Sequence, residues 1–201
     1  MYDMLGRFAS EDVRDRSVQA LMTRYSVDRK QAKRVVKTAQ ELFEQVKNRL
    51  GLTAEDADLL RRGAYLHEIG LAISHSSYHR HSAYLLENSD IDGFSQVDKV
   101  RMGQLVMHHR RKLKSDGLDE VKMVGGDNLV YLTLLLRLAV LTHHSRSKQE
   151  DIQFQLVAKD SQHWQITIHP DSDAASLLVS DLQDEIDIWQ RWGMQLDVIV
   201  V

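Results

Sequence analysis

The sequence contains no cysteine and only one proline among its 201 residues. The lack of cysteine excludes disulfide bonds, thiolate zinc sites and cysteine nucleophiles. Glycine-rich phosphate loops and nucleophile elbows are also missing, so the usual nucleotide-binding and serine-hydrolase motifs are not indicated. No stretch reaches the ~18 unbroken apolar residues of a membrane span, and the first residues contain no signal-peptide core. We therefore expect a cytoplasmic protein with no integral membrane contact, and a peripheral contact, which needs no anchor, stays open.

The composition is that of an ordinary globular protein whose charge is unevenly distributed. Hydrophobic residues make up 43% of the chain and charged residues 27%, which is enough to build one good core and a small second one. Residues 1–150 carry 24 Lys and Arg against 20 Asp and Glu, whereas residues 151–201 carry 2 against 9. The first part can attract an anion, and the second would repel one.

Helical periodicity runs through the chain to about residue 147. Apolar residues recur at helical spacing over 28–51, 53–70 and 95–109, and the stretch 128–142 is apolar on almost every side. His67 falls on the apolar stripe of the second of these helices. Sequence signals for caps occur at Asp28 and Gly51, at Thr53 with Asp56, at Gly70, and at Ser95 with Asp98.

The pattern changes after residue 150, where apolar and polar residues alternate. This alternation predicts a β-hairpin over 152–168, followed by a helix that Gly193 closes and a last strand over 194–200. The sequence thus predicts a mainly α protein, in which a helical domain over 1–147 precedes a small α+β domain, of ββαβ order, over 148–201.

Six of the ten histidines lie between residues 67 and 109, in YLHEIGLAISHSSYHRHSAYLL and VMHHRRKL. Imidazole is a common ligand of transition metals, so the cluster first suggests a metal site. On an apolar stripe, however, a hydrogen-bonded core histidine is favoured for His67, and Glu68 would then be its partner or that of an arginine.

The same region is rich in hydrogen-bond donors. Arginine offers a fork that matches phosphate oxygens, and lysine adds a point charge, so we consider anion binding and a solvated surface equally. Arginines near the amino terminus are further candidates, with pairing to Glu11, Asp12 and Asp15 as the alternative. The predicted phosphate-binding residues are His75, His79, His81, His108, His109, Arg110, Arg111, Lys112, Arg7, Arg14 and Arg16.

Several segments resemble a known family. LGRFASEDVRDRS, QAKRVVKTAQELF, LHEIGLAISHSSYHRHSAYLLENSDIDGFS and LVMHHRRKLK are similar to the carboxy-terminal region of the exopolyphosphatase and guanosine pentaphosphate phosphohydrolase (Ppx/GppA) family. The resemblance covers nearly the whole chain. It implies an HD-domain-like helical domain before a small α+β domain. It also implies a separate actin-like catalytic half that uses magnesium to release terminal phosphate, with Arg7, Arg14 and Arg16 near the junction.

The resemblance allows the histidines to be compared with a working HD centre. Such a centre uses an upstream histidine, a His-Asp doublet and a later aspartate to hold a metal ion that activates water. Here His67-Glu68 occupies the doublet, and Lys33 and Arg34 stand on the upstream helix in place of a histidine. Val140 stands where the aspartate is expected. We therefore predict a degenerate centre without metal. Were a metal bound, its ligands would be His67, Glu68, His81 and His108.

The predicted function is that of an accessory module of an exopolyphosphatase. It would bind and guide inorganic polyphosphate and support a homodimer, with no cofactor and no catalysis of its own. Three alternatives remain open: an active HD-type, metal-dependent phosphohydrolase, the corresponding module of a guanosine pentaphosphate phosphohydrolase, and a purely structural dimerisation domain. Nucleic acid is not an expected partner, because no strongly basic face carries interleaved aromatic residues.

Overall fold

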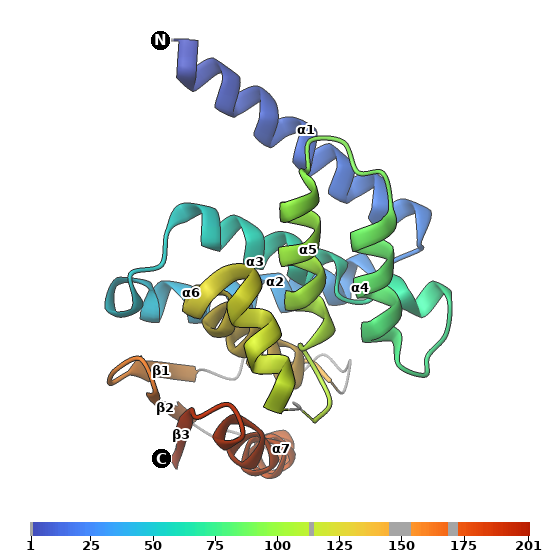
Figure 1. Ribbon diagram of the computed structural model, residues 1–201. Helices are drawn as coiled ribbons and strands as arrows, with labels where there is room; N and C mark the ends of the chain where they lie inside the picture. Colours follow the sequence, from blue (N-terminus) through green and yellow to red (C-terminus); the bar gives the residue numbers. More distant parts are fainter. Residues whose placement is uncertain (1, 113–114, 145–153, 169–172) are drawn as a thin grey trace.

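A computed structural model describes residues 2–112, 115–144, 154–168 and 173–201. Helices dominate, and a small sheet lies at the carboxy-terminal end (Figure 1). This confirms the prediction of a mainly α protein followed by a ββαβ unit. The elements are α1 (Tyr2–Arg24), α2 (Arg29–Leu50), α3 (Ala54–Leu66), the 3-10 helix η1 (Ile69–Ala72), α4 (Tyr78–Asn88), α5 (Gln96–Met107), α6 (Ser115–Thr142), β1 (Phe154–Ala158), β2 (His163–Ile168), α7 (Asp173–Gln190) and β3 (Gln195–Val200).

The amino-terminal half of α1 extends beyond the other helices, and its carboxy-terminal half is attached to them by ion pairs (Figure 1). Arg14 donates to the Gly93 carbonyl at 2.8 Å and lies 3.2 Å from Asp98. Asp15 accepts from Arg61 at 2.9 Å. Arg14 and Asp15 thus join α1 to other elements, whereas the side chains of Glu11 and Asp12 lie outside the described residues, so the predicted pairing with them stays a prediction.

The predicted caps of α2, α3 and α5 are confirmed. Asp28 accepts the backbone N–H groups of Lys30 and Gln31, and Gly51 adopts a φ of 67°. Both predicted capping boxes are formed, by Thr53 with Asp56 and by Ser95 with Asp98. Such caps satisfy backbone donors that lack a partner inside the helix, which explains why they could be identified locally.

The second predicted helix ends earlier than its sequence indicated. It stops at Leu66, and a 3-10 turn contains Gly70, the expected terminator. Gly70 packs directly on α4, because its N–H donates to the Ser82 hydroxyl at 2.8 Å and a Cβ there would lie 2.2 Å from the Tyr78 carbonyl oxygen. The glycine is thus required by a close backbone approach rather than by a helix end.

The apolar stretch predicted over 128–142 forms the second part of α6. Gly126 interrupts this helix with φ 65° and ψ −163°, and residues 129–139 beyond it are all buried. By length and composition alone the segment Gly117–Thr142 could cross a membrane, but 61% of its most apolar window is buried within the protein. The finding fits a core helix.

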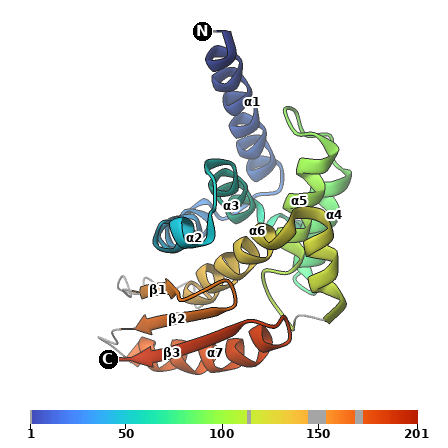
Figure 2. The ribbon, with the colours of Figure 1, turned by 60° about the vertical axis from the view of Figure 1, so that its left-hand side comes forward.

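The ββαβ unit packs its sheet against the helices (Figure 2). β1 pairs antiparallel with β2, and β2 pairs parallel with β3. Trp164 of β2 is fully buried, with its ring centroid 5.5 Å from that of Trp189 and 5.8 Å from that of Tyr131 on α6. One apolar cluster therefore extends from the helices into the sheet. The boundary at 147/148 falls outside the described residues and stays a prediction.

Candidate anion-binding site

Three buried histidines and a tyrosine meet where α3, α4 and α5 come together. His67 and His109 are each 1% exposed, and their ring centroids lie 5.2 Å apart in an edge-to-face arrangement. Tyr78 and His79, which begin α4, have ring centroids 5.7 and 6.4 Å from that of His109. We call these four residues the histidine cluster.

Hydrogen bonds fix the orientation of two of these rings. The Nδ1 atoms of His67 and His109 lie 2.7 and 2.5 Å from the carbonyl oxygens of Ala64 and Val106. Because a carbonyl can only accept, each Nδ1 must carry the proton. The Nε2 atom of His109 is then an acceptor, and it lies 3.5 Å from the Tyr78 hydroxyl. Both rings are therefore fixed in tautomer and orientation within the core.

Two members of the histidine cluster resist protonation. Burial lowers the pKa of His79 to about 4, assisted first by the charge of Arg110 and then by those of Arg80 and Arg111. Burial also lowers the pKa of His109 well below its ordinary value, and its neighbours His67, His79 and Arg110 act in the same direction. The surroundings of the cluster thus carry an excess of positive charge, which favours an anion.

A cavity of about 160 Å³ opens beside the histidine cluster, between the start of α4, the segment 109–111 that follows α5, and helices α6 and α7. Arg137 lies at its wall and is 2% exposed. Its Nε and Nη2 atoms donate to the two carboxylate oxygens of Glu185 at 2.9 and 2.6 Å, and its other bonds reach the carbonyls of His108 and Arg111. The lining residues are Tyr78, His109, Arg110, Arg111, Arg137, Val140, Leu141, His144 and Glu185.

The buried Arg137 holds the two outer arginines in place. Arg111 adopts a φ of 68°, a left-handed conformation that costs energy for a residue with a Cβ, and its carbonyl oxygen accepts from Arg137 at 3.0 Å. The preceding Arg110 places its guanidinium 4.5 Å from the centroid of the Tyr78 ring. Arg110 and Arg111 thus stand at the mouth of the cavity on a fixed stretch of backbone.

Comparison with known proteins identifies the chain's family. Residues 13–186 match the sequence model described as "Ppx/GppA phosphatase, domain III". The chain belongs to the Ppx/GppA phosphatase family. Curated relatives named guanosine-5'-triphosphate,3'-diphosphate pyrophosphatase occur in Vibrio atlanticus, Pseudoalteromonas translucida and Aeromonas hydrophila.

These relatives are considerably longer than the chain. The Vibrio protein is 35% identical over 80% of this chain and 32% of its own length. The Pseudoalteromonas protein is 32% identical over 98% of this chain and 40% of its own length, and the Aeromonas protein is 32% identical over 96% and 39%. The chain thus spans about two fifths of the length of these relatives or less, and it corresponds to the domain III region of the Ppx/GppA family.

Among the described residues, the side chains that were compared with an HD centre do not come together as a set of metal ligands. Within the described part of the chain, no three His, Asp or Glu side chains converge as metal ligands. His67 and Glu68 are buried, and the His67 Nδ1 atom bonds to a backbone carbonyl. His108 is at the end of α5 with its ring centroid 5.6 Å from that of Trp192, and His81 is half-buried on α4. No metal-dependent step is therefore assigned to this chain.

The predicted phosphate-binding residues occupy different environments. His109, Arg110 and Arg111 line the cavity, and His79 is buried in the histidine cluster. Arg14 bonds to Gly93 and Asp98 away from the cavity. His75, Lys112 and Arg16 are exposed, His81 and His108 are partly exposed, and the side chain of Arg7 lies outside the described residues.

Sequence reasoning missed six of the nine residues that line the cavity, and four of these are polar, namely Tyr78, Arg137, His144 and Glu185. Arg137 could have been found, because it is the only charge within the apolar stretch 128–142. A buried charge needs a partner, so an isolated arginine in a core helix predicts a buried acidic residue nearby. Which carboxylate it would be could not be predicted, since Glu185 is 48 residues away.

Proposed function

We propose that this chain is an accessory module of a Ppx/GppA phosphohydrolase that binds the phosphate groups of the substrate, while hydrolysis takes place elsewhere in the full-length enzyme. The observation that carries the proposal is the cavity beside the histidine cluster, which is lined by three arginines and a single carboxylate. In this proposal the module has no catalytic activity of its own. It docks against the magnesium-dependent, actin-like half and supports a homodimer.

The charges around the cavity support phosphate as the ligand. Glu185 is bound by both of its oxygens to Arg137, so this carboxylate is largely compensated. Arg110 and Arg111 are not offset by another acidic residue of the lining, and Lys112 is exposed next to them. Guanidinium groups bind phosphate oxygens in pairs, which suits an anion with several equivalent oxygens.

The names of the relatives bear on the identity of the substrate. All three relatives described above are named for guanosine-5'-triphosphate,3'-diphosphate, whereas the sequence led us to expect polyphosphate. Both are condensed phosphate anions that an arginine-lined cavity can bind. We propose the guanosine nucleotide as the substrate of the full-length enzyme, with polyphosphate as the second candidate.

Calorimetric titration tests the proposal. The chain is titrated with guanosine-5'-triphosphate,3'-diphosphate, with polyphosphate and with orthophosphate, at several salt concentrations. Because a hydrogen bond to a charged group contributes about 1.5 kcal/mol or more, the change Arg110→Gln with Arg111→Gln should weaken binding at least about tenfold. The matched control changes Lys37→Gln with Lys47→Gln and removes the same charge from α2, so its affinity should stay close to that of the wild type.

Two results would contradict the proposal. Equal loss of affinity in both double variants would mean that only net charge matters and that the cavity is not the binding site. Release of phosphate by the purified chain in manganese, abolished by His67→Ala, would establish the active HD-type hydrolase instead.

Affinity for the polyphosphate should also fall steeply with salt, because its counterions are released on binding.

A further inference from the structure

The strand β3 forms an open edge of the sheet. The described strands are ordered β1-β2-β3, so β3 has a strand neighbour on one side only. The backbone N–H groups of Gln195 and Val201 donate toward the β2 side, to the carbonyls of Gln162 and Ile168. Because backbone groups alternate along a strand, Leu196, Val198 and Val200 direct their N–H and C=O groups toward the open edge.

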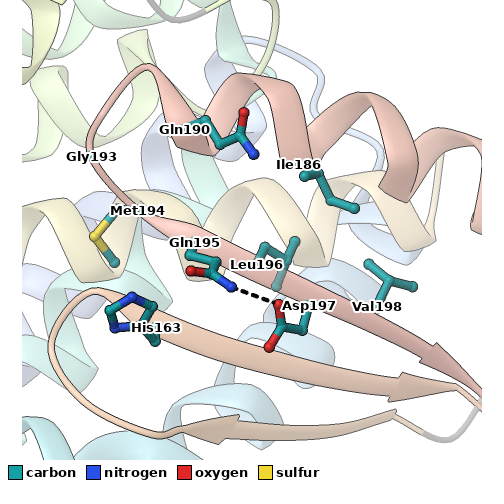
Figure 3. A pocket seen from close by; sticks show the side chains of 9 residues that line it. All are labelled: His163, Ile186, Gln190, Gly193, Met194, Gln195, Leu196, Asp197 and Val198. Atoms are coloured by element: carbon teal, nitrogen blue, oxygen red, sulfur yellow. Dashed lines mark hydrogen bonds between the residues drawn. The ribbon is translucent and has the colours of Figure 1, made fainter.

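A hollow of about 560 Å³ follows this edge. Ile186 and Gln190 of α7 form one wall, and Leu196 and Val198 of β3 form the other (Figure 3). Its end is closed by the turn at Gly193, which adopts a φ of 68°. A free strand edge beside a helix offers an added strand both backbone hydrogen bonds and a place for every second side chain.

The edge lacks the features that usually prevent strand addition. Natural edge strands carry lysine, proline or a bulge, yet β3 reads QLDVIV and pairs with β2 residue by residue without a bulge. Asp197 is the one charged residue of β3, and its carboxylate accepts from Lys159 at 2.9 Å and from Gln195 at 3.0 Å. Ile199 and Val200, in contrast, are 40% and 48% exposed.

The charge of this region selects the partner. Residues 151–201 carry 9 acidic against 2 basic residues, and Asp184 and Asp187 are exposed on α7. A second copy of the same edge would bring two acidic units together, which like-charge repulsion disfavours. We propose that β3 and α7 form a docking groove for an extended peptide segment in which apolar residues alternate with lysine or arginine. The segment adds to β3 as a fourth strand.

A synthetic peptide tests this groove without involving the anion cavity. The probe is a fluorescent seven-residue peptide of alternating lysine and valine, titrated by anisotropy against the whole chain up to about 1 mM. Its twin is methylated on every backbone nitrogen, so that neither of its edges can donate to β3, and a second twin carries glutamate in place of lysine. We expect saturable binding of the probe and at least tenfold weaker binding of both twins.

Variants of the protein complete the test. Val198→Pro removes an N–H group that faces the open edge and leaves the ladder with β2 intact. The affinity of this variant for the probe should therefore be at least tenfold lower than that of the wild type. The control Val198→Ala keeps this N–H group and should bind within about threefold of the wild type. Because the methylated twin leaves the protein unchanged, the test holds even if the proline variant folds poorly.

Three outcomes would overturn the proposal. They are no saturable binding of the probe, equal binding of the probe and its methylated twin, and a dimer in sedimentation that Val198→Pro abolishes. The last outcome would identify a second copy of β3 as the occupant in place of a basic peptide. Hydrogen exchange supplies a positive check, since the probe should protect the amides of Leu196, Val198 and Val200 at least tenfold.

Discussion

Acidification should destabilise this protein well before its carboxylates are protonated, and His79 is one reason. The pKa of His79 lies near 4 in the folded chain, below its ordinary value of 6.5, because the ring is buried beside Arg110, Arg80, Arg111 and His108. In the unfolded chain these influences are absent. Between pH 6.5 and 4 the unfolded chain therefore binds a proton that the folded chain does not, and stability falls as the pH falls.

The size of the effect follows from the two pKa values. The difference between 6.5 and about 4 corresponds to roughly 3 kcal/mol of unfolding free energy, lost gradually as the pH drops from about 7 to about 4. A domain is commonly stable by only about 5–15 kcal/mol, so this loss is large. The pKa of His109 is lowered as well and adds a further loss in the same direction.

Urea denaturation at several values between pH 7.5 and pH 4 measures this effect. His79→Gln cannot take up the proton, so the difference in unfolding free energy between wild type and variant should shrink by roughly 3 kcal/mol toward pH 4. Glu87 and Asp15 are present in both proteins and their shifts do not depend on His79, so their titrations cancel in the difference. His75→Gln removes an exposed histidine of the same segment and should behave like the wild type, because its ring lies in solvent in both states.

Parallel curves for the wild type and His79→Gln over this range would refute the reasoning. They would mean that the ring of His79 gains access to water, or that the arginines around it move away when it is protonated. Titration of the His79 ring followed by NMR would then show a pKa near 6.5 in the folded protein. The same NMR series with phosphate present also measures whether a bound anion raises this pKa toward its ordinary value.

Two further substitutions test the packing around the cavity. Arg137→Leu leaves the carboxylate of Glu185 buried without its partner, so we expect a loss of about 3–5 kcal/mol in urea denaturation, whereas Arg137→Leu combined with Glu185→Gln should recover part of it. Gly70→Ala places a Cβ 2.2 Å from the Tyr78 carbonyl oxygen and 2.5 Å from the Ser82 nitrogen, so it should cost at least about 1–3 kcal/mol. A thermal midpoint of Gly70→Ala equal to that of the wild type would contradict this contact.

The helix starts could be predicted from the sequence because their causes are local. Asp28, Thr53 and Ser95 satisfy backbone donors two or three residues away, so each signal and its effect lie within one turn. The hairpin was predictable for the same reason, since its strands are separated by four residues. The end of α3 was not, because the requirement for glycine at residue 70 comes from Tyr78, whose carbonyl lies on the next helix.

The candidate site was only partly predictable. The donor-rich segment that ends at Lys112 was identified from residue types, and three of the predicted residues, His109, Arg110 and Arg111, do line the cavity. The sequence could not indicate that His79 turns inward while His75 stays in solvent, because both occur in one polar stretch. Nor could it supply Glu185, which reaches the cavity only because α7 packs beside α6.

The ion pair between Arg137 and Glu185 also influences how the protein unfolds. It joins α6 to α7 with side chains that are 1% and 8% exposed, and Trp189 of α7 adds a hydrogen bond to the same carboxylate. Separation of the small ββαβ unit from the helices would break this ion pair and the hydrogen bond from Trp189. Because one apolar cluster also extends from the helices into the sheet, we expect the two sequence regions to unfold together as one cooperative unit.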